Sequence, residues 1–299
     1  MKKLSTIIAI VMLAATLMGC DSDTELQKPS EVTVNNEQAS INSTESTDDS
    51  TKEEVTITEA VLLDEAGVKI TAKSFSEDSL FGPEVKLLIE NNSGKNLTFQ
   101  ARNTSVNGFM TANTMSVNVV NGKKANDSLT LFKSSLEDAG IEKVSDIELS
   151  FYIFDSDEWD EYLSTPQIQI KTSAYGNYVH SFDDSGDVVL DDNGIKIVIK
   201  GLNNDDLLGQ SIVVYVENNT GRNITVQNDN VSVNGFMVNS IYSCNVVDTK
   251  RAIDSITFLS TELEENEITD IESVELSFHI FDSDSWDTIL DTETVTINF

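Results

Sequence analysis

The sequence predicts an all-β protein that contains two copies of one antiparallel β-sandwich domain, and two observations support this prediction. First, the chain repeats itself without a gap at an offset of 127 residues, from Val61 against Val188 to Thr172 against Phe299. Second, each copy consists of short apolar and alternating runs separated by turn-forming residues, with little that is typical of helices. A copy of about 110 residues has an ordinary domain size and can bury its own core.

Three motifs define the repeat. Residues 90–96, with the sequence Glu-Asn-Asn-Ser-Gly-Lys-Asn, return as Glu-Asn-Asn-Thr-Gly-Arg-Asn at 217–223. The hexapeptide Ser-Val-Asn-Gly-Phe-Met at 105–110 returns unchanged at 232–237, and Phe-Asp-Ser-Asp at 154–157 returns at 281–284. These matches indicate that one whole domain was duplicated. We therefore predict one domain over residues 55–175 and a second over residues 176–299.

The elements of one copy follow from its local patterns. Asn107-Gly108 is a strong signal for a two-residue hairpin, and Gly94 is suited to a turn that needs a positive φ. A single helical turn is expected near Leu136, where Gly140 can end it. The patterns of the first copy predict strands over residues 68–73, 85–89, 97–100, 115–120, 128–131, 147–154 and 167–171, and the second copy repeats them.

Seven or eight short strands per copy favour an immunoglobulin-like β-sandwich, and a small closed barrel is the alternative. The repeat, above all the Glu-Asn-Asn-x-Gly-x-Asn turn followed by a strand and Asn-Gly, resembles the immunoglobulin-like domains of unknown function found in Gram-positive bacterial lipoproteins. The resemblance covers both copies. It implies a fold and a cellular address, and it implies no activity.

The N-terminus has the features of an export signal. Lys2 and Lys3 precede an apolar run over residues 6–17, which is shorter than a membrane span. The run ends in Leu17-Met18-Gly19-Cys20, which resembles the lipobox of bacterial lipoproteins. That resemblance implies a signal peptide over residues 1–19 and a diacylglyceryl group on the Cys20 sulfur. Two acyl chains would anchor the protein stably at the outer face of the plasma membrane.

Residues 20–54 are expected to form a flexible acidic tether, because they are rich in Ser, Thr, Asn, Asp and Glu and show no sustained period. This composition suggests a Gram-positive source. The whole chain has 19 basic and 51 acidic residues, a formal net charge of -32, and 39% hydrophobic residues. An ordinary core can therefore form, and repulsion between like charges excludes nucleic acid as a partner.

Neither cysteine nor histidine points to catalysis. Cys244 is the one cysteine besides Cys20, so no intramolecular disulfide is expected, and its match to Val117 predicts a small buried side chain. The two histidines, His180 and His279, are not repeated between the copies. Because no nucleophile elbow, phosphate-binding loop or Cys/His metal spacing is present, we predict that the protein is not an enzyme.

An acidic loop that follows a strand near the end of each copy is the best candidate for chemistry. Closely spaced carboxylates after a strand suit Ca²⁺, although the later glycine and glutamate of an EF-hand loop are absent. The alternative is a solvated acidic turn, in which case no cofactor is bound. The candidate calcium ligands are Asp155, Asp157 and Asp160 in the first copy and Asp282, Asp284 and Asp287 in the second.

Each acidic loop also carries a tryptophan, Trp159 or Trp286. Packing into the core is favoured for both, and an exposed platform that stacks on sugar rings is the alternative. The hairpin tips Phe109-Met110 and Phe236-Met237 are expected to fold back onto the sandwich, or else to form an apolar contact surface. Between the copies, Tyr175, Tyr178 and Phe182 suggest an ordered junction.

These features favour a non-enzymatic, lipid-anchored cell-surface binding or interaction module. Its expected partners are the membrane, through the anchor, and an envelope protein or polysaccharide. The alternative is a calcium-dependent carbohydrate or cell-wall polymer binding protein. The two functions differ in one structural expectation: the first predicts buried tryptophans, and the second predicts an exposed tryptophan beside the carboxylates.

Overall fold

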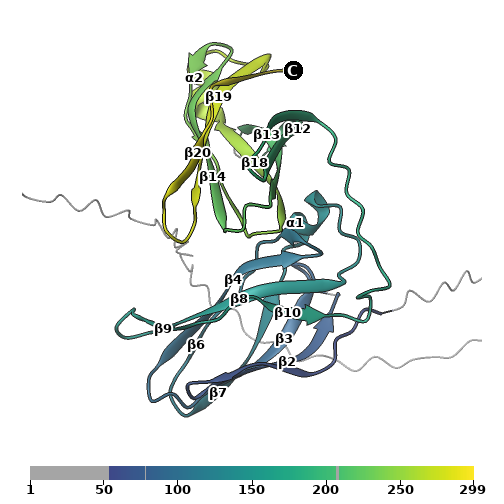
Figure 1. The fold of residues 1–299 in the computed structure, drawn as a ribbon, viewed down its shortest axis with the longest axis vertical. Coiled ribbons are helices and arrows are strands. Elements are labelled where there is room, and N and C mark those ends of the chain that lie inside the picture. Colours follow the sequence, from purple (N-terminus) through teal and green to yellow (C-terminus); the bar gives the residue numbers. More distant parts are fainter. Residues whose placement is uncertain (1–53, 78, 207–208) are drawn as a thin grey trace, which may run out of the picture. The chain divides into compact units, whose positions relative to one another are not determined.

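The computed structural model describes residues 54–77, 79–206 and 209–299. Strands make up most of this part of the chain, and its two helices are single short elements, α1 (Lys133–Asp138) and α2 (Ser260–Glu265) (Figure 1). The all-β prediction is confirmed. The predicted signal peptide, Cys20 and the tether up to residue 53 lie outside the described residues. Within the described ranges, no helix is long and apolar enough to cross a membrane.

The first copy, residues 61–172, forms two antiparallel sheets. The first sheet has the order β1 (Ala60–Glu65), β2 (Val68–Ser76), β3 (Glu84–Asn91) and β7 (Lys123–Thr130). The second has the order β10 (Ile168–Lys171), β8 (Asp146–Asp155), β4 (Leu97–Val106) and β5 (Phe109–Met110). Two further strands join it: β6 (Ser116–Val119) pairs with β4, and β9 (Glu161–Ser164) pairs with β8.

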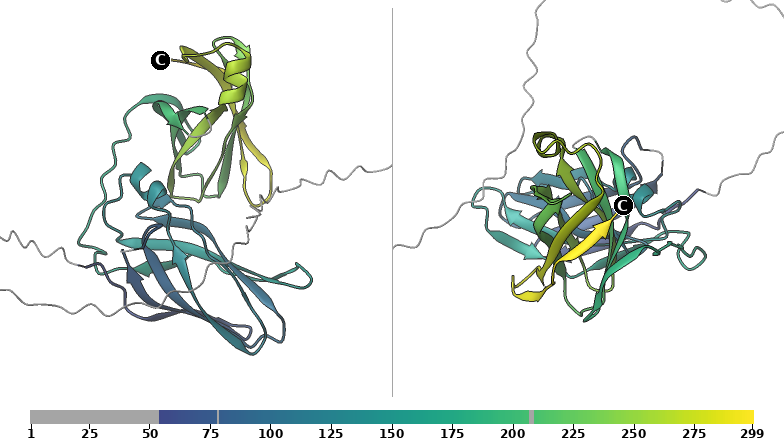
Figure 2. Two further views of the ribbon diagram at one scale, coloured as in Figure 1. Left: turned by 180° about the vertical axis from the view of Figure 1, so that it is seen from behind. Right: turned by 90° about the horizontal axis from the view of Figure 1, so that it is seen from above.

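The second copy, residues 188–299, repeats this arrangement. Each strand of the first copy has a counterpart that begins within two residues of the 127-residue offset. One sheet contains β11 (Asp187–Asp192), β12 (Ile195–Asp206), β13 (Gly209–Asn218), β18 (Arg251–Leu259) and the short β16 (Ser240–Ile241). The other contains β14 (Ile224–Val233), β15 (Phe236–Met237), β17 (Ser243–Val246), β19 (Ser273–Asp282), β20 (Thr288–Asp291) and β21 (Val295–Asn298) (Figure 2).

Each copy has its own apolar core between its two sheets. In the first copy, Leu87 and Ile89 of one sheet and Phe99 and Phe151 of the other are buried in one cluster. The second cluster combines residues of β12, β13 and β18 with residues of β14 and β19. Because the two sheets of a copy face each other without a shared ladder of hydrogen bonds, each copy is a sandwich rather than the closed barrel of the alternative prediction.

The copies also contact each other. Strand β18 of the second copy pairs in parallel with the tip strand β5 of the first, with Arg251 opposite Phe109. Val198 and Tyr215 of the second copy pack in the apolar cluster of the first, and Phe182 from the link stacks on Tyr215 at 5.5 Å. The aromatic residue of the link therefore takes part in an ordered contact.

The predicted Asn-Gly hairpins are present in both copies. Asn107 and Gly108 have φ values of 50° and 86°, and their counterparts Asn234 and Gly235 have 50° and 84°. Both positions of a type I′ turn need a positive φ, which asparagine and glycine tolerate. The Asn107 side chain also accepts a hydrogen bond from the Ser145 N–H at 2.8 Å, so the turn is tied to the start of β8.

The two helices end in the same way with different residues. Gly140 follows α1 with φ +63°, and the Ile141 N–H donates to the Leu136 carbonyl, as a Schellman motif requires. In the second copy Glu267 occupies the same position with φ 56°, and the Ile268 N–H donates to the Leu263 carbonyl. A left-handed conformation costs a residue with a Cβ atom about 1 kcal/mol, and it costs glycine little.

This difference predicts opposite effects of two substitutions. Glu267→Gly is expected to raise the free energy of unfolding by about 1 kcal/mol, because it removes the strain at this helix end. Gly140→Ala is expected to lower it by about the same amount, since the nearest atom to the added Cβ is His180 Cε1 at 4.0 Å and only the backbone is strained. Urea denaturation measures both, and equal effects of the same sign would contradict the prediction.

Candidate functional site

The acidic loop of the first copy is organised around Asp155, at the end of β8. Asp155 is 5% exposed, and its Oδ1 accepts hydrogen bonds from the N–H groups of Asp157 at 2.9 Å and Glu158 at 3.3 Å. Its Oδ2 accepts a hydrogen bond from Lys95 Nζ at 2.6 Å. The Lys95 ammonium, followed by the backbone N–H of Asp157, lowers the pKa of the Asp155 carboxyl. Asp155 is therefore a charged side chain that holds the loop.

The second copy repeats this loop with a weaker cation contact. Asp282 Oδ1 accepts hydrogen bonds from the N–H groups of Asp284 at 2.9 Å and Ser285 at 3.0 Å. These backbone donors lower the pKa of Asp282. Arg222 occupies the position of Lys95, and its Nη1 lies 4.0 Å from Asp282 Oδ2. Both loops therefore owe their shape to backbone hydrogen bonds onto one carboxylate.

The remaining aspartates of the two loops do not converge on one point, and three of them accept hydrogen bonds from different side chains. Asp157 accepts a hydrogen bond from Asn96 Nδ2 at 3.1 Å, and Asp284 accepts one from Asn223 Nδ2 at 3.2 Å. Asp160 and Asp287 are exposed, and the latter accepts a hydrogen bond from the Ser285 hydroxyl. In the described part of the chain, no three His, Cys, Asp or Glu side chains are grouped so that they could hold a metal ion.

The predicted packing of both tryptophans in the core is wrong. Trp159 is 75% exposed and Trp286 is 74% exposed, and both have φ 65°, in the left-handed region. Each is the last residue of the turn that the aspartate organises, since its N–H donates to the carbonyl of Asp155 or Asp282 at 2.8 Å. The turn directs the side chain away from the core, which alternation along the sequence could not show.

Each tryptophan ring rests on an aromatic ring of the preceding strand. The ring centroids of Trp159 and Phe154 lie 5.5 Å apart with an interplanar angle of 23°, and those of Trp286 and Phe281 lie 5.4 Å apart at 17°. Stacking of this kind restrains the ring while leaving much of it open to solvent. In Figure 1 the β8–β9 hairpin that carries Trp159 extends beyond the neighbouring strands.

Small polar hollows lie beside the two loops. The hollow at Trp286 has a volume of about 240 Å³, and Asn223, Asn245 and Asp284 are among its lining residues. The hollow in the first copy has a volume of about 250 Å³ and is lined by Lys95, Asp155 and neighbouring residues. Amide and carboxylate groups beside an exposed indole are a combination that can bind a polar ring by stacking and hydrogen bonds.

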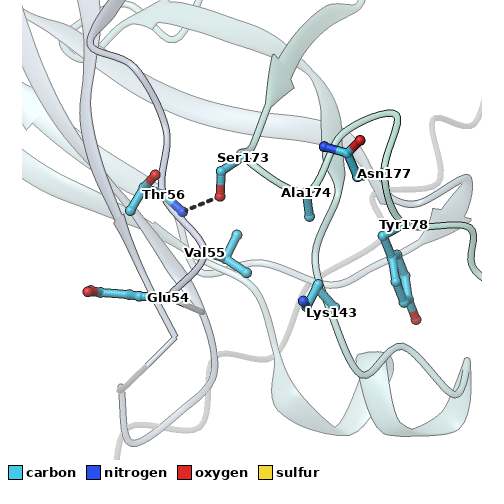
Figure 3. A pocket seen from close by; sticks show the side chains of 8 residues that line it. All are labelled: Glu54, Val55, Thr56, Lys143, Ser173, Ala174, Asn177 and Tyr178. Carbon is cyan, nitrogen blue, oxygen red and sulfur yellow. Dashed lines mark hydrogen bonds between the residues drawn. The ribbon is translucent and has the colours of Figure 1, made fainter. Parts of the chain in front are cut away.

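A larger hollow of about 490 Å³ lies where the chain enters and leaves the first copy (Figure 3). The Thr56 N–H donates to Ser173 Oγ at 3.1 Å, and the Ser173 N–H donates to the Thr56 carbonyl at 2.8 Å. Lys143 and Tyr178 line the opposite part of the hollow in Figure 3. These two hydrogen bonds join the segment that enters the first copy to the segment that leaves it.

The other singled-out residues have structural surroundings. Cys244 is buried as predicted, and burial raises the pKa of its thiol. His279 Nδ1 lies 2.5 Å from Asp291 Oδ1 on the neighbouring strand, and His180 contacts the Phe109 ring. The tips differ: Phe109 is buried, as expected, while Phe236 and Met237 are exposed, against the expectation that they fold back.

The calcium hypothesis leads to a direct prediction. In fixed high salt, Ca²⁺, Mg²⁺ and EGTA are expected to give the same melting temperature, because both Asp155 oxygens are engaged by protein donors and neither loop, as described, groups three side chains that could hold a metal ion. A calcium site with a Kd of tens of micromolar would instead add about 2–3 kcal/mol at millimolar Ca²⁺ and raise the melting temperature by several degrees. Such a shift, absent with Mg²⁺, would establish the site.

Comparison with known proteins gives no family for this chain. No family model matches it, and no curated protein matches it. Among solved structures, a crystal structure of the YadV chaperone aligns over 72% of this chain and 92% of its own, with 10% sequence identity and a TM-score of 0.22. A likeness at that score supports no conclusion about fold or function.

Proposed function

We propose that the protein is a non-enzymatic binding module of two immunoglobulin-like sandwiches, lipid-anchored through Cys20, which contacts an envelope partner through its two tryptophan loops. One observation carries the proposal: each copy holds a bulky tryptophan, about three-quarters exposed, in a left-handed conformation. Such a conformation is unusual for a large side chain, and strained residues are concentrated at functional sites. Here the strained conformation occurs once in each copy, and in both copies the same backbone hydrogen bond and the same stacked phenylalanine hold it in place.

Two equivalent sites on one chain favour a partner that offers repeated contacts. An array of anchored proteins or a polymer can engage both loops, and the second contact then forms at a high effective concentration. A modest affinity per loop is therefore sufficient. The lipid anchor and the tether would hold the loops at the cell surface, where such partners are found.

A carbohydrate or cell-wall polymer is the second candidate for the partner. It is favoured by the exposed tryptophan beside carboxylate and amide groups, because this was the structural expectation that separated the alternative from the interaction module, for which buried tryptophans were predicted. The calcium dependence of the original alternative is a separate matter, tested by the melting experiment described above.

Fluorescence provides a test, because Trp159 and Trp286 are the two tryptophans of the chain. Titration with cell-wall polysaccharide fragments or with purified envelope proteins is expected to shift the emission to shorter wavelength and to reduce quenching by acrylamide. Trp159→Ala and Trp286→Ala are each expected to weaken binding by about tenfold, because an aromatic anchor of this kind supplies much of the energy of a small interface. The double variant has no tryptophan left to report binding, so calorimetry follows its titration, and it should lose binding.

The matched controls are Leu80→Ala and Val179→Ala, since both side chains are 87% exposed and lie outside the loops. They are expected to bind like the wild type. Full binding by the double tryptophan variant would refute the proposal. Binding of polysaccharide fragments rather than proteins would select the second candidate.

A further inference from the structure

The two hairpin tips have the same sequence and the same local geometry but different surroundings. Strand β4 pairs with β5 in the register in which β14 pairs with β15, with Val106 opposite Phe109 and Val233 opposite Phe236. Phe109 is fully buried, while Phe236 is 50% exposed and Met237 is 68% exposed. Local sequence therefore does not bury the first tip. A neighbouring surface does.

That neighbouring surface is the edge of β18. The Arg251 N–H donates to the Gly108 carbonyl at 3.0 Å, which continues the sheet from one copy into the next. Beside this bond, Lys250 Nζ lies 2.6 Å from Glu148 Oε1 in an ion pair that is mostly buried, with the two side chains 11% and 23% exposed. The contact thus combines an apolar tip, a strand edge and one ion pair.

The first copy has an equivalent edge that is open. Strand β7 corresponds to β18 and lies at the end of its sheet, and within the described ranges it has no strand partner on its outer side beyond the bridge of Asn113 to Leu131. Lys123 and Lys124 take the positions of Lys250 and Arg251. Unpaired strand edges of this kind readily accept a further strand.

The charges of the contact are also repeated. Glu275 of the second copy takes the position of Glu148, and Lys123 of the first takes that of Lys250. Both side chains are exposed, and among the described residues neither forms an ion pair. The second copy therefore presents an uncovered tip beside Glu275, and the first copy presents an unpaired strand edge that carries Lys123.

We propose that the partner of the free tip is a second copy of this chain, so that molecules associate head to tail. Phe236 and Met237 of one molecule would lie on the β7 edge of the next, with the Gly235 carbonyl accepting the Lys124 N–H and Glu275 paired with Lys123. Because tip and edge are different surfaces, the contact is heterologous and builds filaments or rings. It uses none of the tryptophan loops.

The contact between molecules is weaker than the one within the chain, for two reasons. Thr71 and Leu88 replace the buried Val198 and Tyr215 beneath the tip, so less apolar surface is covered. In addition, Val55, which lies 127 residues before Phe182 and ahead of the repeat, is buried in the core of its own copy and cannot fill the contact. Association therefore requires a high local concentration of the protein, which the proposed membrane anchor would provide.

Sedimentation velocity of the full-length protein, in a detergent that keeps a lipid anchor soluble, tests the proposal. The weight-average sedimentation coefficient is expected to rise as the protein concentration is increased to about 1 mM. This range is chosen because tethering molecules side by side produces effective concentrations of about that size. Phe236→Ser should abolish the rise. Lys123→Glu and Glu275→Lys should each weaken association by about tenfold, since each places like charges together.

A mixture of the two charge variants gives the sharpest outcome. An equimolar mixture of Lys123→Glu and Glu275→Lys molecules is expected to recover association, because each tip then meets an edge of opposite charge. Lys171→Glu, which changes an exposed lysine elsewhere, is the matched control, and the double tryptophan variant should associate like the wild type. A wild type that stays monomeric, or association unchanged by Phe236→Ser and by both reversals, would overturn the proposal.

Discussion

Replacing Asn218, the last residue of β13, with alanine is expected to lower the free energy of unfolding by about 3 kcal/mol. Asn218 is fully buried. Its Nδ2 donates to the carbonyls of Arg222 at 2.7 Å and Val246 at 2.8 Å, and its Oδ1 accepts from the Thr220 N–H at 3.0 Å and from the Thr220 hydroxyl at 2.8 Å.

The size of this effect follows from what alanine would leave behind. The Val246 carbonyl would lose a buried donor, and an unsatisfied buried group costs about 1–3 kcal/mol. The turn between β13 and β14 would also lose the side chain that links it to β17. Asn91 makes the same four contacts in the first copy, with the carbonyls of Lys95 and Val119 and with Ser93.

Urea denaturation measures the loss, and the motif itself supplies the control. Asn219, the next residue, is exposed, so Asn219→Ala is expected to cost less than 0.5 kcal/mol, about the range for surface substitutions. A loss below about 1 kcal/mol for Asn218→Ala would show that the buried amide is not central to the turn.

Asn91→Ala and Asn218→Ala, one in each copy, together test the predicted domains, 55–175 and 176–299. If the copies unfold independently, Asn91→Ala should shift one transition and Asn218→Ala the other. If instead both variants shift a single transition, the contact between Phe109 and β18 couples the copies.

Replacing Cys20 with alanine is expected to abolish labelling with palmitate and to release the protein from the membrane fraction. The thioether lipid would carry two acyl chains, and each buried methylene contributes about 0.8 kcal/mol to membrane binding, so the change is from nearly complete binding to almost none. Cys20 lies outside the described residues, and the expectation rests on the Leu-Met-Gly-Cys motif.

Cys244→Ala is the matched control, because Cys244 is the other cysteine and is buried with its thiol unavailable for modification. This variant is expected to keep both the label and the membrane association. Labelling of the Cys20→Ala protein would contradict the lipoprotein prediction, because no second acceptor sulfur is exposed in the described residues.

The sequence by itself determined the all-β class and the turns, because these depend on interactions over a few residues. The repeat can be read directly from the sequence. Asn107-Gly108 and Gly140 adopt the positive φ values that their residue types favour. The strands predicted over residues 85–89 and 147–154 are present within β3 and β8. Strand β7 starts earlier than the predicted strand over 128–131. Its polar first half forms a strand because it pairs with β3, although its own sequence does not alternate between apolar and polar residues.

The tertiary structure alone decided which of two identical side chains is buried. The hexapeptide at 105–110 and its twin at 232–237 have one sequence, yet only the first meets a strand edge and an aromatic residue of the link. Likewise, Trp159 and Trp286 are exposed because Asp155 and Asp282 close a turn that ends in a left-handed residue. Burial depends on neighbours that are distant in the chain, and periodicity along a segment carries no information about them.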